Sequence, residues 1–210
     1  MAEKTQGTII RVESTRAAAK TISGITAANP PVVTATGHGY ANGDIVIISG
    51  VAGMTEVNDR AFVVANQATN TFELKGVNAT GYTAYSSGGS AFKCTMIAVG
   101  EATGVNGSGG GAQQIDVTNL NSKTQETLPG LPALTSLTID ITLNHTDAGQ
   151  TAMRDLAEAT AYKALTVTTP GGYVLAATGQ TSDYGFSFDK NAAQVGSFTF
   201  TFYRKFSWFA

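Results

Sequence analysis

Residues 136–144 alternate apolar and polar side chains without a break. Leu137, Ile139, Ile141 and Leu143 occupy every second position, and serine, threonine, aspartate and asparagine fill the others. A period of two is that of a β-strand, whose successive side chains point to opposite faces of a sheet. The pattern therefore predicts a half-buried strand, with one face toward a core and the other toward water.

Residues 197–208 repeat this alternation with aromatic side chains. The aromatic parity consists of Phe198, Phe200, Phe202, Phe206 and Trp208. The other parity consists of Thr199, Thr201, Tyr203 and Lys205. A long aromatic strand at a chain end is an aggregation hazard unless something covers it. We therefore expect the chain to work by assembling rather than by turning over a substrate.

The composition is poor in charge. Of 210 residues, 13% are charged, about half the usual share. Two explanations carry equal weight: a subunit largely covered by copies of itself, or a β-rich protein with Ser/Thr-decorated strands. The net charge is −2 and the basic residues are scattered, so the usual form of nucleic-acid binding is not expected.

No pattern in the sequence predicts a reactive site. The single cysteine, Cys94, lies in the apolar run 91–99, which favours a buried structural thiol and excludes a disulfide framework. His38 and His145 lack the neighbouring ligands of a metal site. No Gly-x-Ser-x-Gly elbow is present. We expect no catalytic, cofactor-binding or metal-binding residues, no cofactor, and no enzymatic activity.

The glycine-rich run 104–111 is not expected to bind phosphate. A phosphate-binding loop needs a Lys-Ser/Thr pair and then a helix, whereas this run leads into a predicted strand. We expect a flexible loop that orders against a neighbour. The first residues lack the apolar stretch of a signal peptide, and no run approaches the length of a membrane span. We therefore expect no membrane insertion.

The chain reads as short strands separated by turns rich in Gly, Asn and Ser. We expect strands at residues 7–14, 32–36, 45–49, 61–64, 71–75, 91–99, 114–120, 136–143, 165–169, 173–178, 184–188 and 197–206. One helix is expected at 148–162, capped by Asp147. Its apolar face, which includes Leu156, should pack on a sheet against Leu137, Ile139, Ile141 and Leu143. The fold class is mainly β, with one flanking helix.

Residues 25–91 are predicted to form a separate unit. They contain four acidic and two basic residues, a net charge of −2, while the rest of the chain has eleven of each. Four short strands in this stretch indicate a small β-barrel or sandwich. We therefore expect two domains: 1–24 with 92–210, and an inserted, surface-exposed β domain at 25–91.

The ordered set of motifs outside that insert resembles the tail tube proteins of long-tailed, non-contractile bacteriophages. The resembling positions are 97–101, 115–122, Glu126, 130–132, 137–143, the helix after Asp147, 165–167, 170–172 and the closing aromatic strand. Within the insert, 34–40, 43–46 and 71–74 resemble small β modules of phage tail proteins, a module also noted in ubiquitin-activating enzymes.

The resemblance implies a structural virion protein, made in the host cytoplasm and located in the tail. It implies a tail-tube β-sandwich or barrel whose subunits form hexameric rings, stacked into a hollow tube through which DNA is ejected. Implied partners are the chain itself, the tape measure and tail tip proteins, and DNA that passes without specific binding. The alternative is a virion decoration or adhesin-like protein that binds host-surface carbohydrate through 25–91.

Three segments are expected to mediate assembly. They are an N-terminal arm at 2–7, a long turn at 119–132 and the C-terminal aromatic strand. Turns of this length are able to order on contact with a neighbour. The insert should project outward and be dispensable for tube formation, because a lumen that passes DNA has no room for six extra domains.

Overall fold

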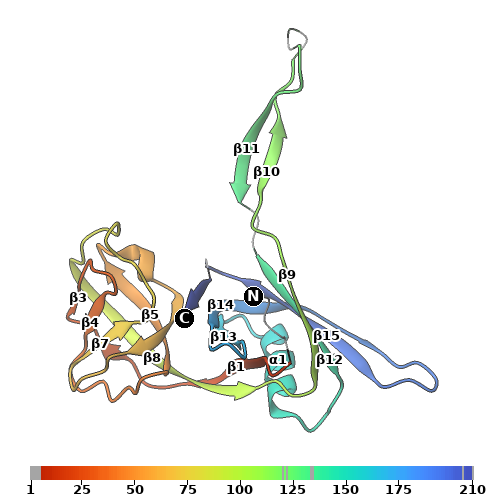
Figure 1. The fold of residues 1–210 in the computed structure, drawn as a ribbon, viewed down its shortest axis with the longest axis horizontal. Coiled ribbons are helices and arrows are strands. Elements are labelled where there is room, and N and C mark those ends of the chain that lie inside the picture. The colour runs from red at the N-terminus through yellow and green to blue at the C-terminus, as the bar shows by residue number, and fades with distance from the viewer. Residues whose placement is uncertain (1–5, 120, 122, 133–134, 205, 210) are drawn as a thin grey trace.

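The fold is one long, curled antiparallel sheet with a single α-helix and a projecting arm (Figure 1). It is a computed structural model and describes residues 6–119, 121, 123–132, 135–204 and 206–209. Residues 25–91 occupy one end of the molecule, and a long hairpin leaves the other end. The predicted fold class, mainly β with a flanking helix, is confirmed. Most of the expected arm at 2–7 lies outside the described residues.

The strands follow the chain in short antiparallel steps. They are β1 (Ile9–Arg16), β2 (Lys20–Thr21), β3 (Gly24–Ile25), β4 (Val32–Thr34), β5 (Ile45–Ala52), β6 (Arg60–Ala65), β7 (Thr71–Leu74), β8 (Ser87–Ala98), β9 (Ala102–Ser108), β10 (Ala112–Asp116), β11 (Thr127–Pro132), β12 (Ser136–Thr142), β13 (Lys163–Thr168), β14 (Val174–Ser187), β15 (Val195–Phe202) and β16 (Ser207–Phe209). The helices are a short 3-10 turn (Thr55–Val57) and α1 (Ala148–Glu158). The main sheet runs β3-β4-β7-β6-β5-β8-β1-β13-β14-β15-β12-β9, and β10 pairs with β11 alone.

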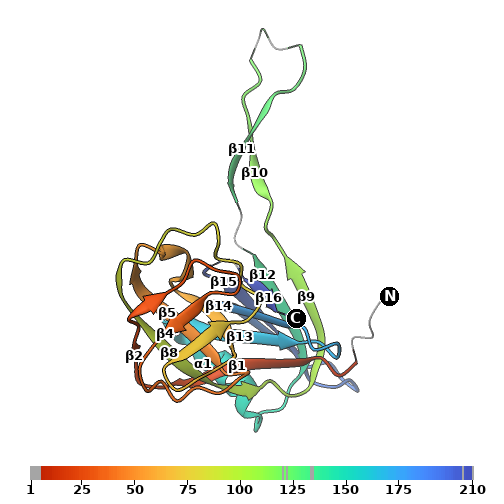
Figure 2. The same ribbon diagram turned by 60° about the vertical axis from the view of Figure 1, so that its left-hand side comes forward.

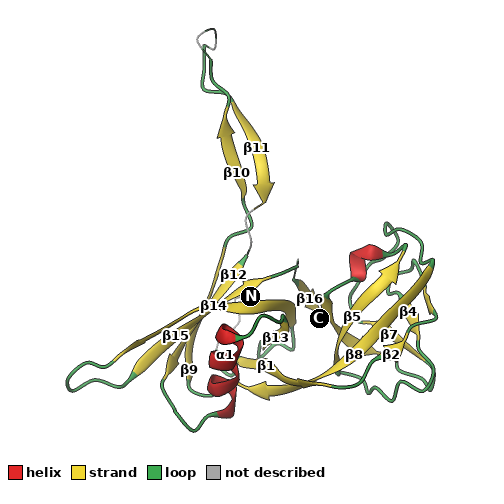
Figure 3. Ribbon diagram, turned by 180° about the vertical axis from the view of Figure 1, so that it is seen from behind, coloured by secondary structure: helices red, strands yellow, loops and turns green. Residues whose placement is uncertain are grey.

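The apolar face predicted for β12 is buried. Leu137, Ile139 and Ile141 join Met153 and Leu156 of α1 in one hydrophobic cluster, and Leu143 packs against it. The helix lies on one side of the sheet, against β14, β1 and β8 (Figure 3). The alternation in the sequence therefore located one face of this core correctly.

The start of α1 was predicted correctly, but its end was not. The Asp147 carboxylate accepts a hydrogen bond from the Gln150 amide at 2.7 Å, as expected of a cap. The helix stops at Glu158 rather than at residue 162. The next residue, Ala159, is already extended, with φ −81° and ψ 150°, because the chain straightens before Lys163 pairs with Gly179 in the sheet. Sheet pairing therefore overrides the helical pattern.

The C-terminal aromatic stretch is not one long edge strand. β15 lies between β14 and β12, so both of its edges are paired within the subunit. The chain then turns, and β16 pairs with β14 instead. The turn reverses the expected parity, because Phe209 is 1% exposed and Trp208 is 53% exposed. Lys205 lies outside the described residues. The exposed aromatic edge inferred from the sequence is therefore wrong.

Two further expectations about loops are corrected. Most of the glycine-rich run 104–111 is strand, because β9 pairs with β12 from Ala102 to Ser108. At Gly104 an added Cβ would lie 3.0 Å from an oxygen of Asp140 on β12, so glycine suits this close approach. The long turn expected at 119–132 is largely a hairpin, in which β11 returns along β10.

The strands expected at 173–178 and 184–188 are one element, β14, which continues through the polar residues between them. This strand pairs with β13 in its first half and with β15 in its second half. Its length takes it beyond the last residue pair with β13, so within the described ranges its second half has a strand neighbour on one side only. This arrangement leaves an open side at residues 180–187.

Residues 25–91 contribute strands β4 to β7 and the first part of β8 to a core of their own. Val33, Phe62, Phe72 and Leu74 are fully buried there. The same hydrophobic cluster includes Ala164, Ala176 and Phe209 from the other end of the sheet. Arg60 Nη2 also donates to Ser207 Oγ at 2.6 Å. The segment thus has a core and also shares packing with the rest of the chain.

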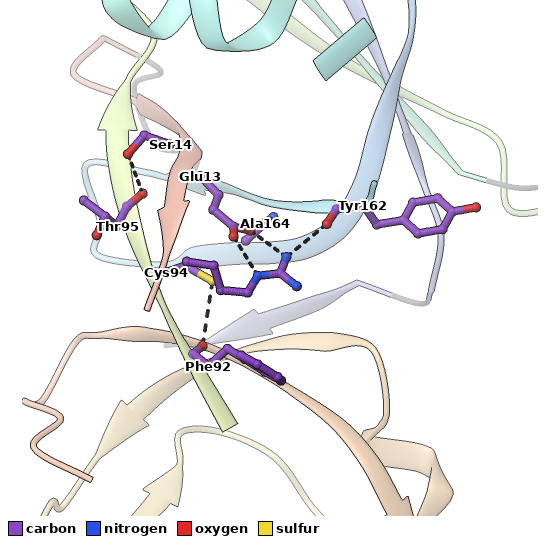
Figure 4. Close-up of polar contacts among 8 residues, drawn as sticks. Glu13, Ser14, Phe92, Cys94, Thr95, Tyr162 and Ala164 are labelled. Atoms are coloured by element: carbon purple, nitrogen blue, oxygen red, sulfur yellow. Dashed lines mark hydrogen bonds and ion pairs between the residues drawn. The ribbon is translucent and has the colours of Figure 1, made fainter. Parts of the chain in front are cut away.

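A buried polar network lies where β1 pairs with β8 (Figure 4). Glu13, 2% exposed, accepts hydrogen bonds from Arg16 Nε at 2.8 Å and from the Ala164 amide at 2.7 Å. Beside it, Cys94 is buried and its Sγ lies 3.9 Å from Phe92 O. Burial raises the pKa of the Cys94 thiol. The prediction of a buried structural thiol is confirmed.

Candidate assembly surfaces

Four strands at one end of the main sheet, β14, β15, β12 and β9, form what we call the open sheet. β9 is the last strand of the sheet and pairs only with β12 among the described residues. At the opposite side, β13 begins at Lys163, which pairs with Gly179 of β14. Past this pair, residues 180–187 of β14 pair with β15 alone among the described residues. Both lateral edges of the open sheet therefore carry backbone groups free to pair with another strand.

One face of the open sheet is mainly polar, and its described residues include no lysine or arginine. Cross-strand partners share a face, so the pairing register identifies its members. On β9 and β12 they are Gly104, Asn106, Ser108, Ser136, Thr138 and Asp140. On β15 and β14 they are Val195, Ser197, Thr199, Thr201, Gln180, Asp183, Gly185 and Ser187, and Val195 also pairs with Thr142 of β12. The two charged members, Asp140 and Asp183, are both acidic.

The opposite face is apolar, and part of it is uncovered. Near the helix it is the buried core, with Ile139 beside Phe198. Toward the turn of the β14–β15 hairpin, which extends from the body (Figure 1), α1 no longer covers it. There Phe186 and Phe188 are 57% and 58% exposed, with ring centroids 5.3 Å apart. Exposed aromatic clusters of this kind mark interaction surfaces.

The β10–β11 hairpin forms an arm that extends well away from the body (Figure 2). Its ladder continues past the strands, since the Val117 amide donates to Glu126 O at 2.9 Å. Thr118 donates to the Asp116 carboxylate and thereby holds the pKa of that group below its ordinary value. Ile115 and Leu128 are 53% and 56% exposed. The arm thus presents apolar side chains without a core of its own.

The residues considered for chemistry in the sequence do not converge. His38 is buried; its Nε2 lies 2.8 Å from Ala68 O, and its Nδ1 accepts from the Tyr40 amide at 2.9 Å. His145 is exposed beyond β12. Burial raises the pKa of Tyr40 to about 12, and its hydroxyl donates to Ala91 O at 2.9 Å. These contacts give His38 and Tyr40 a structural role.

The described part of the chain holds no group of three or more His, Cys, Asp or Glu side chains placed to hold a metal ion. Within the same ranges, no helix has the length and apolar character needed to cross a membrane.

The model of the phage tail tube protein family matches residues 52–210. The chain belongs to this family. It is therefore a structural subunit of a virion tail, as the sequence motifs indicated. The uncovered edges, aromatic hairpin and arm are therefore found in a member of the phage tail tube protein family.

Similarity to individual proteins is more distant. Two solved structures align at 16% identity with a TM-score of 0.43: one described as the virion of a native gene transfer agent particle, the other as the tail of an empty particle with C6 symmetry. Each alignment covers 55% of this chain, and 89% and 87% of those chains respectively. No curated protein matches the chain.

Sequence reasoning missed both open edges. A signal for the β14 edge was present, because Tyr184, Phe186 and Phe188 alternate as they do in a strand. The polar residues before Tyr184 concealed its continuity with the first half of β14. The β9 edge gave a weaker signal, since Gly104 and Gly107 have no side chains to show a period. Both edges follow from pairing that is distant in sequence.

Proposed function

We propose that this chain builds the wall of a hollow phage tail tube, as hexameric rings stacked along an axis, through which DNA is ejected. The observation that carries the proposal is the open sheet, whose two lateral edges have no partner strand in the part of the chain that the structure describes. A head-to-tail contact repeated around a rotation axis closes into a ring. Closure of a sheet is also the arrangement that removes its edges.

In this proposal, β9 of one subunit pairs with residues 180–187 of β14 in the next. Both elements are extended, and each has one strand neighbour within its own subunit. In this arrangement the neighbouring subunit covers the exposed rings of Phe186 and Phe188. Burying them supplies the apolar contact that backbone pairing alone does not provide.

The polar face of the open sheet lines the lumen. Its serine, threonine and asparagine side chains are short and uncharged, and its charged members are Asp140 and Asp183. Lysine or arginine would bind the phosphates of passing DNA, and this face has neither. A DNA conduit needs low friction, so a neutral-to-acidic wall suits passage without specific binding. The apolar, helix-covered face is directed outward.

The arm reaches the adjacent ring. It leaves the body at the end of β9 and carries exposed apolar side chains along its length.

Residues 25–91 form an outward-facing domain, since they lie at the end of the sheet remote from β9. Tape measure and tail tip proteins are the partners inside and at the end of the tube. No catalytic step is assigned to any residue, and synthesis takes place in the host cytoplasm.

Cysteine cross-linking within assembled tubes tests the ring contact. We pair Asp183→Cys on β14 with Gly104→Cys, Asn106→Cys or Ser108→Cys on β9, because all four positions share the polar face. Cys94 is 4% exposed and remains as an internal control. At least one pair should give a ladder of oxidised species ending at six protomers on a non-reducing gel. Tubes that yield no ladder with any pair would refute the contact.

A further inference from the structure

A cavity of about 490 Å³ lies between the strands of segment 25–91 and the rest of the sheet. Its first wall crosses four neighbouring strands in register: the Lys75 amide donates to Val63 O at 2.9 Å, Val63 pairs with Ile45, and Ile45 pairs with Cys94. Its second wall contains Arg11 of β1 with residues of β13 and the start of β14. The two walls come from separate parts of the sequence.

The cavity gathers positive charge. Arg11, Lys75 and Lys93 line it, three of the chain's 13 basic residues, together with one carboxylate, that of Asp44. The net charge of the lining is therefore +2, whereas the net charge of the whole chain is −2.

The single carboxylate is already satisfied. Asp44 Oδ2 lies 2.7 Å from Lys93 Nζ and also accepts from the Ala41 amide at 2.7 Å. Among the described residues, no side-chain hydrogen bond or ion pair engages the Arg11 guanidinium or the Lys75 ammonium. Both residues are only partly exposed. Two cations are thus held at the cavity without an anion of this chain to pair with them.

The remaining lining is mixed. Thr95, Thr166 and Thr168 offer hydroxyl groups, while Met96 and Val174 offer apolar surface. Sites for small organic ligands occupy roughly 300–1,000 Å³ and combine apolar surface with a few placed polar groups. The cavity exceeds the volume of a bare phosphate ion, so there is room for an organic portion beside the anion.

We propose that this cavity binds a small phosphate ester of about sugar size. Two unpaired cations match the double negative charge of a phosphate monoester. Arginine provides the planar pair of donors that phosphate oxygens accept, and lysine provides a second, compact positive charge. The threonine hydroxyls hydrogen-bond the hydroxyl groups of the organic portion. The site does not depend on the ring contact and is a function additional to the tube.

Isothermal titration calorimetry of the full chain tests the proposal, with glucose 1-phosphate, inorganic phosphate and glucose as probes. Glucose 1-phosphate should bind with one site per chain, inorganic phosphate more weakly, and glucose not at all. Arg11→Gln and Lys75→Gln should each raise the dissociation constant about tenfold or more, because each removes a charge-assisted contact. Lys190→Gln, an exposed cation remote from the cavity lining, should leave binding unchanged.

Two results would overturn the assignment. One is the absence of saturable binding of either phosphate probe by the folded wild-type chain. The other is unchanged binding in the Arg11→Gln and Lys75→Gln double variant. Circular dichroism checks folding; should Arg11→Gln unfold, Lys75→Gln carries the test, because Lys75 lies beyond the end of β7. A double variant that loses tube formation, with no phosphate binding by the wild type, would assign the cations to a neighbouring subunit's carboxylate instead.

Discussion

The two ends of the main sheet bury their apolar side chains in different ways. In segment 25–91, Phe62 and Phe72 are fully buried, and the outermost strand, β3, is only two residues long. At the other end, β9 is seven residues long and open. All of the large hydrophobic side chains that are exposed in the described residues lie outside 25–91. One end buries its large hydrophobic side chains within the chain, and the other leaves a long strand edge and aromatic side chains uncovered.

The two edges of the sheet therefore differ in their ability to pair with another chain. Short, irregular edge strands resist pairing with other chains, whereas a long open edge invites it. Charge does not distinguish the two ends, because both are poor in it. The two ends differ in the length of the edge strand and in whether their aromatic side chains are buried within the chain. Changes that uncover or block these features should therefore affect assembly and folding separately.

The largest effect is expected from the double variant Phe186→Asp and Phe188→Asp. Both rings are more than half exposed in the subunit, so folding should be preserved. Full burial of a phenylalanine is worth roughly 1.5–3 kcal/mol, so losing two per contact should raise the concentration needed for assembly more than about a hundredfold. Light scattering against protein concentration measures this.

The matched control adds the same charge to the closed end of the sheet. Gln67→Asp with Thr69→Asp lies in an exposed loop of segment 25–91 and should assemble as the wild type does. If the aromatic variant polymerises at the wild-type concentration, the hairpin is not a subunit contact.

Removal of the arm tip should separate stacking from ring closure. Deleting residues 121–125 shortens the hairpin beyond the pair Val117 and Glu126 and leaves the open sheet intact. We expect a folded chain that no longer makes tubes but still forms rings, because the ring contact lies elsewhere. Electron microscopy and light scattering measure the two products. Normal tubes from this variant would show that the tip has no stacking role.

The core between β12 and α1 should be sensitive to truncation. Ile141 is 1% exposed, so Ile141→Ala should cost about 2–5 kcal/mol through lost burial and the cavity it leaves. Urea unfolding in the non-assembling Phe186→Asp and Phe188→Asp background isolates the subunit. Thr138→Ala, on the polar face of the same strand, should change stability by no more than about 0.5 kcal/mol. A similarly small loss for Ile141→Ala would remove this face from the core.

Replacing residues 25–91 with a short Gly/Ser linker should have the smallest effect on assembly. The ends of the segment are neighbours, since the Ile22 amide donates to Gly89 O at 3.0 Å, and a short linker can span them. Tubes should still form, thinner in projection and with the same lumen. The subunit should be less stable, because Ala176 and Phe209 lose part of their packing. A folded variant that never assembles would make the segment part of the ring contact.

Local patterns predicted the elements of this fold better than their arrangement. The alternation of Leu137, Ile139 and Ile141 and the cap at Asp147 were visible because each depends on neighbours in sequence. The position of β15 between β14 and β12 was not, because pairing between distant segments decides it. The cations at 11, 75 and 93 lie far apart in the chain, and only the folding of β1, β8 and the end of β7 around one cavity brings them together.

Electron cryomicroscopy of tubes grown from the purified chain would show the ring contact itself. We predict a hollow wall in which β9 of each subunit continues the sheet through residues 180–187 of β14 in the next, six subunits to a ring. Asp140 and Asp183 should face the lumen, and residues 25–91 should lie outside. A chain that stays monomeric at high concentration, or a tube in which β9 remains unpaired, would contradict it.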